Sequence, residues 1–494
     1  MRFCRKHERP TREENAAGAF ADAAGKPAGT ICLLSVCLIV CLLLSPGYTR
    51  AGLLDFSIQD EQELGQEFNV LIRTQFPVIY DPVINNYLDG LLQTISSAMP
   101  PQPFSLSITL IKENSLNAFA APAGYIFVHT GMILALQQES ELAGVIAHEL
   151  AHVSQRHLAE RIAQSKLITL GTLAGMLAGA MLGGGGELGQ AVTMGSLAGG
   201  QTAALKYTRD HEREADQIGL NYLQDAGFEA RGLLQSFKRM QQQTLLGGVS
   251  RPPAYMLTHP GLPERIHSLE DRLLSQDSNQ EQEQEQAGQA AFQKIQMLIR
   301  SKYADAGQAL TYYQNLESRP DCLDLLGRGI ALERLNRIKE AEHAFQDALD
   351  CGQAVALICR EYGRFHFLTG SYQAGLEFLN RAIQENPDDY LALYYKARIL
   401  KEIGELNQAT GVLERIRRYL PEVSEIHTLL GQVYGRRGDS FRGYLHLAYS
   451  ALLQNKKQAT EQYIEKVRPL AKTRTQKEAF TSFMDAYNQR KKFW

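Results

Sequence analysis

The sequence lacks an excess of charge of either sign. Its 494 residues contain 51 Lys and Arg against 54 Asp and Glu, which leaves a formal charge of -3 at pH 7. A chain this evenly balanced creates no global field that would attract nucleic acid or an anionic membrane. We therefore expect no nucleic-acid partner, and other partners have to be inferred from local features. The length predicts two or three domains.

Long apolar runs are scarce. Residues 31–44 are apolar but too few to cross a bilayer, and they fit the core of a signal peptide that is cut after Ala51. We predict a signal peptide over residues 1–51 and export of the mature chain, with a retained N-terminal membrane anchor as the alternative. Residues 167–186 carry no charge but are dominated by glycine and alanine. This composition favours a buried or lid-like helical pair over a membrane span and leaves peripheral membrane contact open.

Cysteine is scarce beyond the predicted signal peptide. Only Cys322, Cys351 and Cys359 lie there, so one cysteine stays unpaired even if a disulfide forms. Which two would pair cannot be read from the sequence. We interpret all three as small buried residues of helices.

The first half of the chain predicts an α+β domain. Asp81 and Pro82 begin a run of helically spaced apolar residues. Residues 104–111 then alternate between apolar and polar, and residues 125–128 form an apolar strand after a turn that contains Pro and Gly. Ser140 is expected to cap the next helix. This helix–strand–strand–helix series is typical of an α+β fold with a small sheet.

A period of 34 residues marks the C-terminal part of the chain. It follows a polar, low-complexity stretch over residues 275–289, which we interpret as a solvated linker or a polar helix between two domains. Small residues recur in two registers: Gly363, Ala397 and Gly431, and Gly370, Gly404 and Gly438. Stacked helix pairs need small residues where helices approach closely, and the period is that of the tetratricopeptide repeat. We predict an all-α tetratricopeptide-repeat solenoid over residues 290–494, with the repeats clearest over 325–454.

The stretch VIAHELAHV places two imidazoles and a carboxylate on one apolar helix. His148 and His152 are four residues apart, so both project from one helix face and can reach a single zinc ion. Glu149 lies beside them and can take a proton from an attacking water. The neighbouring residues are uncharged, which indicates a helix buried beside a metal. We predict one Zn²⁺ per chain, with Glu149 as the catalytic base.

A third protein ligand has to come from elsewhere in the chain. The metzincin arrangement requires glycine at position 155 and histidine at 158, and this chain has Gln155 and Leu158. The later stretch RDHEREAD offers Glu212 and Asp216, four residues apart on one helix face. We predict Glu212 as the third ligand of a gluzincin-type site, with Asp216 hydrogen-bonded to a ligand histidine or in contact with the reacting group. Glu214 is expected to point away into solvent.

The order of HELAH, a downstream EREAD and a preceding NAFAAPAGYIFVHTG resembles the peptidase family that includes the HtpX heat-shock protease and the CAAX prenyl protease. A signal peptide before such a domain and tetratricopeptide repeats after it resemble its BepA-like (YfgC-like) branch of periplasmic enzymes of Gram-negative bacteria. The resemblance implies a mainly helical metalloprotease domain over residues 52–274. It also implies a zinc endopeptidase of the periplasm that acts on misassembled outer-membrane proteins, together with chaperone-like activity. In such families the matching residues are metal ligands (His148, His152, Glu212), a catalytic base (Glu149) and a residue assigned as proton donor (Asp216).

Two further residues are candidates for the site. The segment NAFAAPAGYIFV matches the family's edge-strand region, where an extended substrate would pair with the sheet. Asn117 is therefore a candidate for substrate binding, and a plain structural hairpin is the alternative. His259 precedes Pro260 on a short loop. We predict that it either occupies the fourth zinc position as a gate or packs the turn.

Two hypotheses for the function follow. The leading one is a secreted zinc endopeptidase whose repeats dock misfolded clients or an outer-membrane assembly machine. The alternative is a chaperone or adaptor whose peptidase domain is latent or inert. Because both histidines, Glu149 and Glu212 are all present, the sequence favours the active enzyme.

Overall fold

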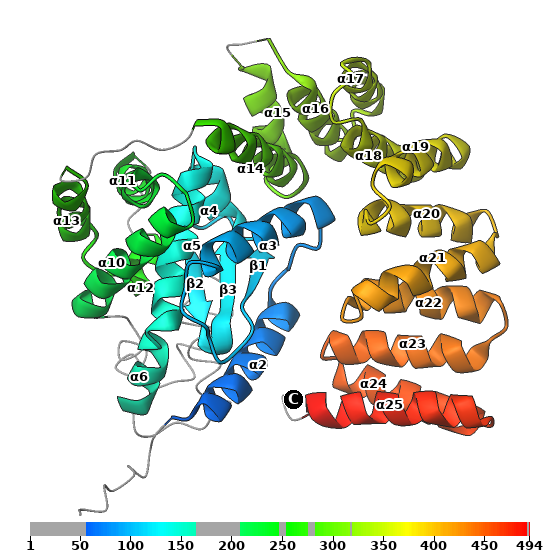
Figure 1. Cartoon of the computed structure of the whole chain (residues 1–494). Coiled ribbons are helices and arrows are strands. Elements are labelled where there is room, and N and C mark those ends of the chain that lie inside the picture. The colour runs from blue at the N-terminus through cyan, green and yellow to red at the C-terminus, as the bar shows by residue number, and fades with distance from the viewer. Residues whose placement is uncertain (1–55, 165–207, 247–252, 275–281, 317–318, 492–493) are drawn as a thin grey trace, which may run out of the picture. The chain divides into compact units, whose positions relative to one another are not determined.

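The computed structural model describes residues 56–164, 208–246, 253–274, 282–316, 319–491 and 494 (Figure 1). Residues from Phe56 to the end of the chain form one compact unit. The predicted signal peptide and the apolar run over 167–186 lie outside the described residues. Among the helices that are described, none is both long and apolar enough to cross a membrane.

A three-stranded sheet with helices packed around it forms the N-terminal half (Figure 1). It consists of β1 (Ser107–Ile111), β2 (Ala118–Ala121) and β3 (Tyr125–His129) in the order β1-β3-β2. Strand β3 runs parallel to β1 and antiparallel to β2. Because β3 lies between the other two strands, β2 lies at an edge. The predicted α+β class with a small sheet is confirmed. The resemblance placed this segment in an edge-strand region, and β2 does lie at an edge, but the residue pattern alone does not show it because all four residues of β2 are buried.

The helices of this half are α2 (Ile58–Gln75), α3 (Pro82–Ser96), α4 (Thr130–Ala135), α5 (Glu139–Ser154), α6 (His157–Gln164), α10 (Arg209–Asp225), α11 (Arg231–Leu246), α12 (Ala254–Thr258) and α13 (Leu262–Leu274). Helix α3 begins as predicted, because the Asp81 side chain accepts a hydrogen bond from the Val83 N–H at 3.1 Å. The prediction for α5 was wrong in one detail. Its N-cap is Gln138, whose side chain makes no capping bond, and Ser140 lies in the first turn.

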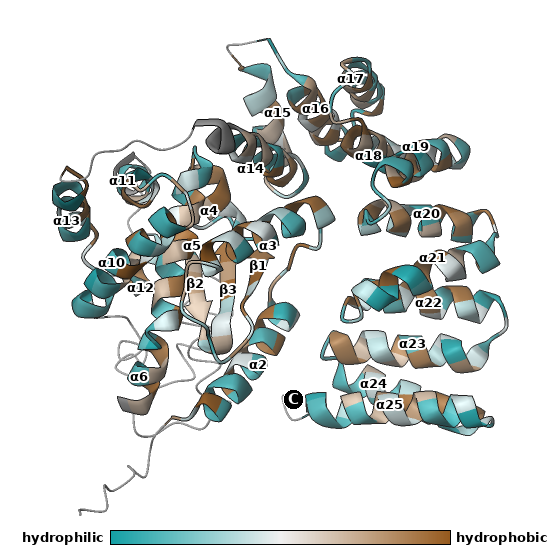
Figure 2. Ribbon diagram, in the orientation of Figure 1, coloured by the Kyte–Doolittle hydropathy of each residue, from teal (hydrophilic) through white to brown (hydrophobic). Residues whose placement is uncertain are grey.

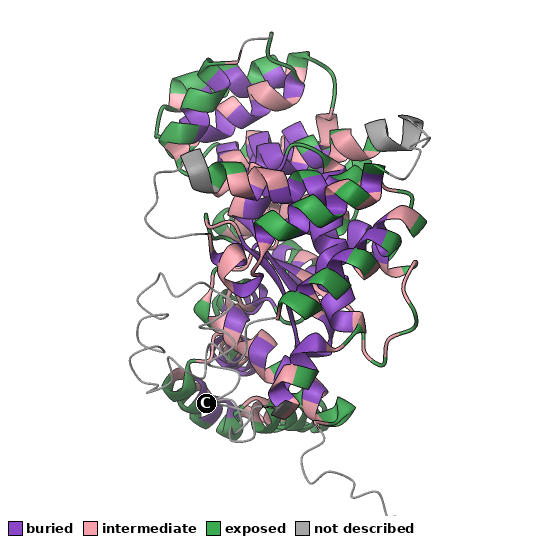
Figure 3. Cartoon of the chain, turned by 90° about the vertical axis from the view of Figure 1, so that its left-hand side faces the viewer, coloured by how far each residue is buried: buried purple, intermediate pink, exposed green. Residues whose placement is uncertain are grey.

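Helix α5 is buried along almost its whole length, from Ser140 to Val153. It packs against α10 on one side and α11 on another. Gly219 of α10 permits this close packing, because a Cβ at that position would come within 3.0 Å of the His148 Cα. The apolar strands and α5 stand out in brown in Figure 2, and Figure 3 colours the buried positions purple. The ionisable residues of α5 therefore sit among packed backbone and apolar side chains.

The second half is entirely helical in the part that the structure describes. Its helices are α14 (Gln282–Lys302), α15 (Ala306–Gln314), α16 (Cys322–Arg334), α17 (Ile338–Asp350), α18 (Val355–Leu368), α19 (Tyr372–Glu385), α20 (Tyr390–Glu402), α21 (Leu406–Tyr419), α22 (Ser424–Arg436), α23 (Ser440–Leu453), α24 (Lys457–Val467) and α25 (Arg474–Arg490). Consecutive helices from α16 to α23 pack in pairs, which confirms the predicted solenoid of helical repeats.

The two registers of small residues have different physical causes. A Cβ at Gly363 would lie 2.6 Å from the Leu379 side chain, so this register marks the predicted close approach of two helices. The other register does not mark a close approach of helices. Gly370, Gly404 and Gly438 have φ of 81°, 88° and 81°, and a Cβ there would meet no described atom within 4 Å. They are glycines because the turn between paired helices needs a left-handed residue.

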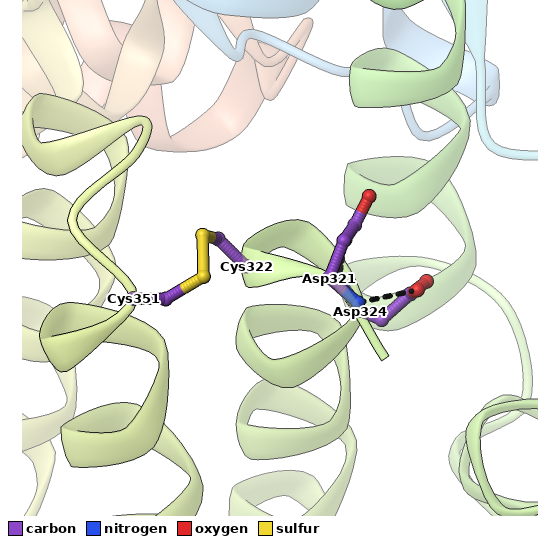
Figure 4. Close-up of a disulfide and its surroundings, with 4 residues drawn as sticks. All are labelled: Asp321, Cys322, Asp324 and Cys351. Carbon is purple, nitrogen blue, oxygen red and sulfur yellow. Dashed lines mark hydrogen bonds between the residues drawn. A yellow bond between two sulfur atoms is a disulfide. The ribbon is translucent and has the colours of Figure 1, made fainter. Parts of the chain in front are cut away.

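A disulfide joins Cys322 at the start of α16 to Cys351 at the C-terminal end of α17 (Figure 4). The interpretation of the cysteines as small buried residues of helices therefore fails for Cys351, which is exposed and follows α17, whereas Cys322 is buried in α16 and forms the disulfide with it. Cys359 is free and buried, as expected. The bond forms because α16 and α17 pack as a pair. This packing brings Cys322, the first residue of α16, beside Cys351, which directly follows α17.

A group of charged side chains connects α3 to the repeats, and we call it the ion cluster. It consists of Asp81, Lys302, Arg360, Glu361 and Asp389, with side chains at most a tenth exposed. Lys302 Nζ donates to both Asp81 Oδ2 and Glu361 Oε1 at 2.8 Å. Arg360 Nη2 donates to Asp81 Oδ2 at 3.1 Å. Asp81 therefore caps α3 and also pairs with Lys302 of α14 and Arg360 of α18.

The start of α14 covers residues 282–289, which the sequence predicted as a linker or a polar helix. Gln296 of α14 donates to the carbonyls of Ile133 and Leu136, both at 2.8 Å. Phe292 belongs to the same buried apolar cluster as residues of α3, α4 and α5. The domain boundary at 275–289 remains a prediction, and the buried core continues across it.

Candidate metal centre

Helix α5 brings three ionisable side chains together at its buried C-terminal half. His148, Glu149 and His152 are at most 1 % exposed. The two imidazoles lie one turn apart, and their Nε2 atoms are 3.1 Å from each other. Two ring nitrogens this close share a proton or face a common ion. This is the arrangement that the spacing of four residues predicted.

Helix α10 supplies the carboxylates from the other side. Thr208 caps this helix by accepting from the His211 N–H, which places Glu212 in the first turn. Its Oε2 lies 3.5 Å from His148 Nε2, and its Oε1 lies 3.6 Å from His152 Nε2. The structure therefore brings together the three residues that the sequence proposed as ligands.

His259 joins the same group from the end of α12. It is the C-cap residue of that short helix and is fully buried. Its Nδ1 lies 3.1 Å from Glu212 Oε1 and 3.4 Å from His148 Nε2. Its other ring nitrogen, Nε2, lies 3.5 Å from Glu149 Oε1. His259 thus contacts two of the proposed ligands and the proposed base.

These four donors fit a tetrahedral cation. Zinc bound at about 2.0–2.1 Å by four such ligands would hold them roughly 3.3 Å apart. Five of the six pairs of donors lie 3.1 to 3.6 Å apart, counting either oxygen of Glu212, and all four donors lie within 4.8 Å of one another. Within the described parts of the chain, no other set of three or more His, Cys, Asp or Glu side chains converges in this way. The donor set of three imidazoles and one carboxylate is one that zinc accepts.

The charges of the buried side chains also favour a bound cation. Three carboxylates, those of Glu149, Glu212 and Asp216, are buried here against the single guanidinium of Arg265. With all three ionised and the imidazoles neutral, the group is two positive charges short. Buried anions without counter-charge are costly. A divalent cation would supply the missing charge.

Arg265 is the residue of this centre that the sequence reasoning missed. Its guanidinium donates to both oxygens of Asp216, at 2.7 and 2.6 Å, and its Nη1 lies 2.6 Å from Glu212 Oε2. The signal was present in the sequence. Arg265 stands with Leu262, Ile266 and Leu269 on the apolar stripe of α13, where a charged residue needs a buried partner.

Asp216 contacts a ligand as predicted, because its Oδ1 lies 3.0 Å from His148 Nδ1. Burial and Arg265 lower the pKa of His148, but its hydrogen bonds with Asp216 and Glu212 outweigh them and raise the pKa to about 9. Burial raises the pKa of Glu212, yet His259 and Arg265 bring it well below its usual range. The carboxylates therefore favour positive charge at His148. A metal ion would take the place of that proton, since ligands bind in their deprotonated form.

The proposed base lies against the edge of the sheet. Glu149 Oε2 accepts a hydrogen bond from the Ala120 N–H of β2 at 2.9 Å. Burial raises the pKa of Glu149. Asn117, the weak substrate-binding candidate, directly precedes β2 and is fully buried, and its backbone carbonyl accepts from the His129 N–H at 3.0 Å. Its role stays a prediction.

A mainly helical domain with a His-Glu-x-x-His helix and a downstream Glu on a second helix defines a metallopeptidase domain. Residues 84–273 match the model of peptidase family M48, and residues 366–433 match a tetratricopeptide repeat model. The chain therefore carries an M48 peptidase domain followed by tetratricopeptide repeats, which confirms the resemblance drawn from the motifs.

Several named proteins are similar to this chain. The beta-barrel assembly-enhancing protease of Yersinia pestis is 30% identical over 288 residues, which cover 58% of this chain and 56% of the relative. The protein of the same name from Escherichia coli (strain K12) is 32% identical over 209 residues, or 42% of each chain. The mitochondrial metalloendopeptidase OMA1 of Schizosaccharomyces pombe is 30% identical over 187 residues, which cover 38% of this chain and 52% of the relative. The chain spans about half the length of these relatives.

Proposed function

We propose that this protein is a zinc-dependent endopeptidase of the periplasm that hydrolyses misfolded or misassembled proteins, in particular those of the outer membrane. The observation that carries the peptidase part is the convergence of His148, His152 and Glu212 beside Glu149. Bound zinc would supply Lewis acidity to the amide carbonyl and to the attacking water. Glu149 would accept the proton of that water and pass it to the leaving amine.

Asp216 has a positioning role in this proposal. Its carboxylate contacts His148 Nδ1 and is itself gripped by Arg265. Both carboxylate oxygens of Asp216 accept hydrogen bonds from the Arg265 guanidinium. Asp216 therefore orients the imidazole of His148 and does not act as the proton donor to the substrate. This favours the first of the two roles that the sequence left open.

The resting site is latent in this proposal. His259 Nδ1 would occupy the fourth position around the metal, where substrate or water has to bind. Its Nε2 also faces one oxygen of Glu149, and Ala120 engages the other. The fourth metal position and the carboxylate of Glu149 are thus both occupied by groups of the protein itself. His259→Ala should leave the fold intact and raise basal proteolysis or self-cleavage, and a stable variant with unchanged basal activity would rule out the gate.

The substrate class and compartment rest on other observations. The Cys322–Cys351 disulfide supports an oxidising compartment. The relatives named as beta-barrel assembly-enhancing proteases support a link to outer-membrane assembly. Helical repeats of this kind bind proteins rather than catalyse, so they would dock clients or an assembly machine.

A chaperone or adaptor with an inert peptidase domain is the competing function. The complete set of ligands and the base argues against it, because an inert domain gains nothing from burying three carboxylates beside a single arginine. Zinc content and cleavage of an unfolded outer-membrane protein separate the two functions. The wild type and Glu149→Gln should each hold about one zinc per chain, because Glu149 is no ligand. Hydrolysis by the variant should fall by several orders of magnitude. Equal cleavage by both proteins would disprove the mechanism.

Glu212→Gln gives a different result if Glu212 is a ligand. A neutral amide binds zinc more weakly than a carboxylate, so this variant should lose metal affinity as well as activity. Unchanged zinc affinity would show that the third ligand has been assigned to the wrong residue.

A further inference from the structure

A short break separates α5, which ends at Ser154, from α6, which begins at His157. Arg156 adopts a left-handed conformation, with φ of 53°, which a non-glycine residue takes only at some cost in free energy. Its guanidinium is held by Glu61 of α2, with Nε and Nη2 at 2.9 and 2.8 Å from Glu61 Oε2. This turn makes His157 the first residue of α6 and folds its ring back over the end of α5.

His157 thereby reaches the outer nitrogen of a proposed ligand. His152 Nδ1 and His157 Nδ1 are 2.9 Å apart, and both rings are at most 2 % exposed. The other nitrogen of His157, Nε2, lies 3.3 Å from Glu214 Oε2. Glu214 was expected to point into solvent, and its side chain is indeed half exposed while it makes this contact. Three side chains thus form a line from the metal centre to the surface.

The positions of the protons follow from the direction of each contact. His152 presents Nε2 to the other ligands, so in the neutral form that binds a metal its proton lies on Nδ1. That N–H donates to His157 Nδ1, which must then be unprotonated. His157 accordingly carries its proton on Nε2 and donates it to Glu214.

The two ligand histidines are therefore held in different ways. His148 has a carboxylate, that of Asp216, directly on its Nδ1 at 3.0 Å. His152 has a neutral imidazole there, and the carboxylate lies one ring further out. Glu214 and Asp216 are two residues apart on α10, so their side chains leave the helix in different directions. Glu214 therefore contacts His157, and Asp216 contacts His148.

We infer that His157 is a positioning residue that fixes the tautomer and ring orientation of His152, and that Glu214 fixes His157 in turn. The inference rests on the proposed function only in requiring a metal at the centre. Residues that orient a ligand imidazole typically change metal affinity by about 10–100-fold when they are removed. Removal of His157 should therefore weaken metal binding although it touches no metal.

The test is zinc affinity of the full-length protein, measured by competition with a chelator, for His157→Phe and His157→Gln. Phenylalanine keeps a ring beside His211, which stacks on His157 at 4.4 Å between ring centres, but offers no acceptor. Glutamine offers a carbonyl oxygen to the His152 N–H. His157→Phe should bind zinc about 10–100-fold more weakly than the wild type, and His157→Gln should recover part of that loss.

Two carboxylate variants complete the set. Glu214→Gln should weaken zinc binding less than His157→Phe does, because the amide oxygen can still accept from His157. Glu270→Gln is the matched control: this carboxylate of α13 pairs with Lys238 of α11, at 2.7 Å, and is not part of the line to His152. Its zinc affinity should equal that of the wild type.

The visible spectrum of the cobalt-substituted protein provides a second readout, because it reports the geometry of the ligand set and needs no hydrolysis. A shifted spectrum is expected for His157→Phe and an unchanged one for Glu270→Gln. If His157→Phe binds zinc as tightly as the wild type and keeps its cobalt spectrum, the inference is wrong. If His157→Phe does not fold, His157→Gln and Glu214→Gln decide, and wild-type affinity in both overturns it. A wild-type chain that takes up no metal would instead overturn the proposed function itself.

Discussion

The metal centre and the ion cluster both bury several charged side chains, but they neutralise them differently. In the ion cluster, Lys302 contacts two carboxylates and Arg360 contacts three, so the protein supplies its own cations. In the metal centre, Arg265 is the one permanent cation among three carboxylates. The cations of the ion cluster are lysine and arginine, which keep their charge across the physiological pH range, whereas the metal centre depends on a proton at His148 or on a bound cation.

The largest expected effect lies in the ion cluster. Arg360→Met leaves Asp81 buried with Lys302 as its cation and Glu361 with Lys302 and Arg364, and the free energy of unfolding should fall by about 3–5 kcal/mol because a buried ion pair loses one partner. Urea denaturation of the full-length protein measures it. Arg337→Ala is the matched control, because Arg337 pairs with Glu340 on the surface, and it should leave the stability unchanged. Similar results for both variants would mean that the ion cluster is not a buried, mutually neutralised group.

The two groups should respond to pH in opposite directions when the protein is free of metal. The pKa of His148 is raised to about 9, so its contribution is complete below pH about 6.5 and is lost as the pH rises through 9. The loss is on the order of 3 kcal/mol. Burial raises the pKa of Asp81 and Glu361, but Arg360 and Lys302 lower both below their usual range. Their contribution is complete above pH about 4.5 and is lost on acidification.

Unfolding curves of the metal-free protein between pH 6 and 9.5 measure the first of these effects. Zinc-loaded protein should not show the alkaline loss, because the metal has already displaced the proton of His148. A metal-free protein whose stability stays constant across this range would contradict the proposed charge state of the centre.

A smaller effect is expected from zinc itself. If zinc supplies the charge that the centre lacks, free zinc at 100 times its dissociation constant should raise the free energy of unfolding by about 2.7 kcal/mol. Thermal unfolding with a chelator and after addition of zinc measures this gain. Glu212→Gln should reduce the gain, whereas Arg337→Ala should keep it. Equal stabilisation of wild type and Glu212→Gln would place the zinc elsewhere.

The features that the sequence revealed are those with a local period. The spacing of His148 and His152 and that of Glu212 and Asp216 follow from helix geometry, whereas the 34-residue repeat follows from stacked helix pairs and the glycine turns that join them. What stayed hidden depends on contacts between distant segments. Asp81 was identified as a helix cap, yet its ion partners lie more than 200 residues away. Cys322 and Cys351 pair because two helices pack side by side, which no spacing rule specifies.

His157 shows how a negative result can still carry information. It stands one place before position 158, where a metzincin would need its third histidine, so the sequence alone gave it no role. The left-handed turn at Arg156 is what returns its ring to the site, and an arginine gives no sign of that conformation. Side chains that hold ligands obey no fixed spacing, because they approach from whichever segment the chain brings back. Arg265 was missed for the same reason, although its place in an apolar stripe gave a warning.

The contact between Gly219 and the backbone of His148 has a consequence for how the site takes up metal. Because the two ligand-bearing helices touch through backbone atoms, their distance is fixed by packing before any ion arrives. The ligands do not have to be gathered from separate mobile segments, so little ordering accompanies uptake. A larger side chain at position 219 would press on the backbone of His148 and so misalign the site, although it would not reach the ring nitrogens that face the metal.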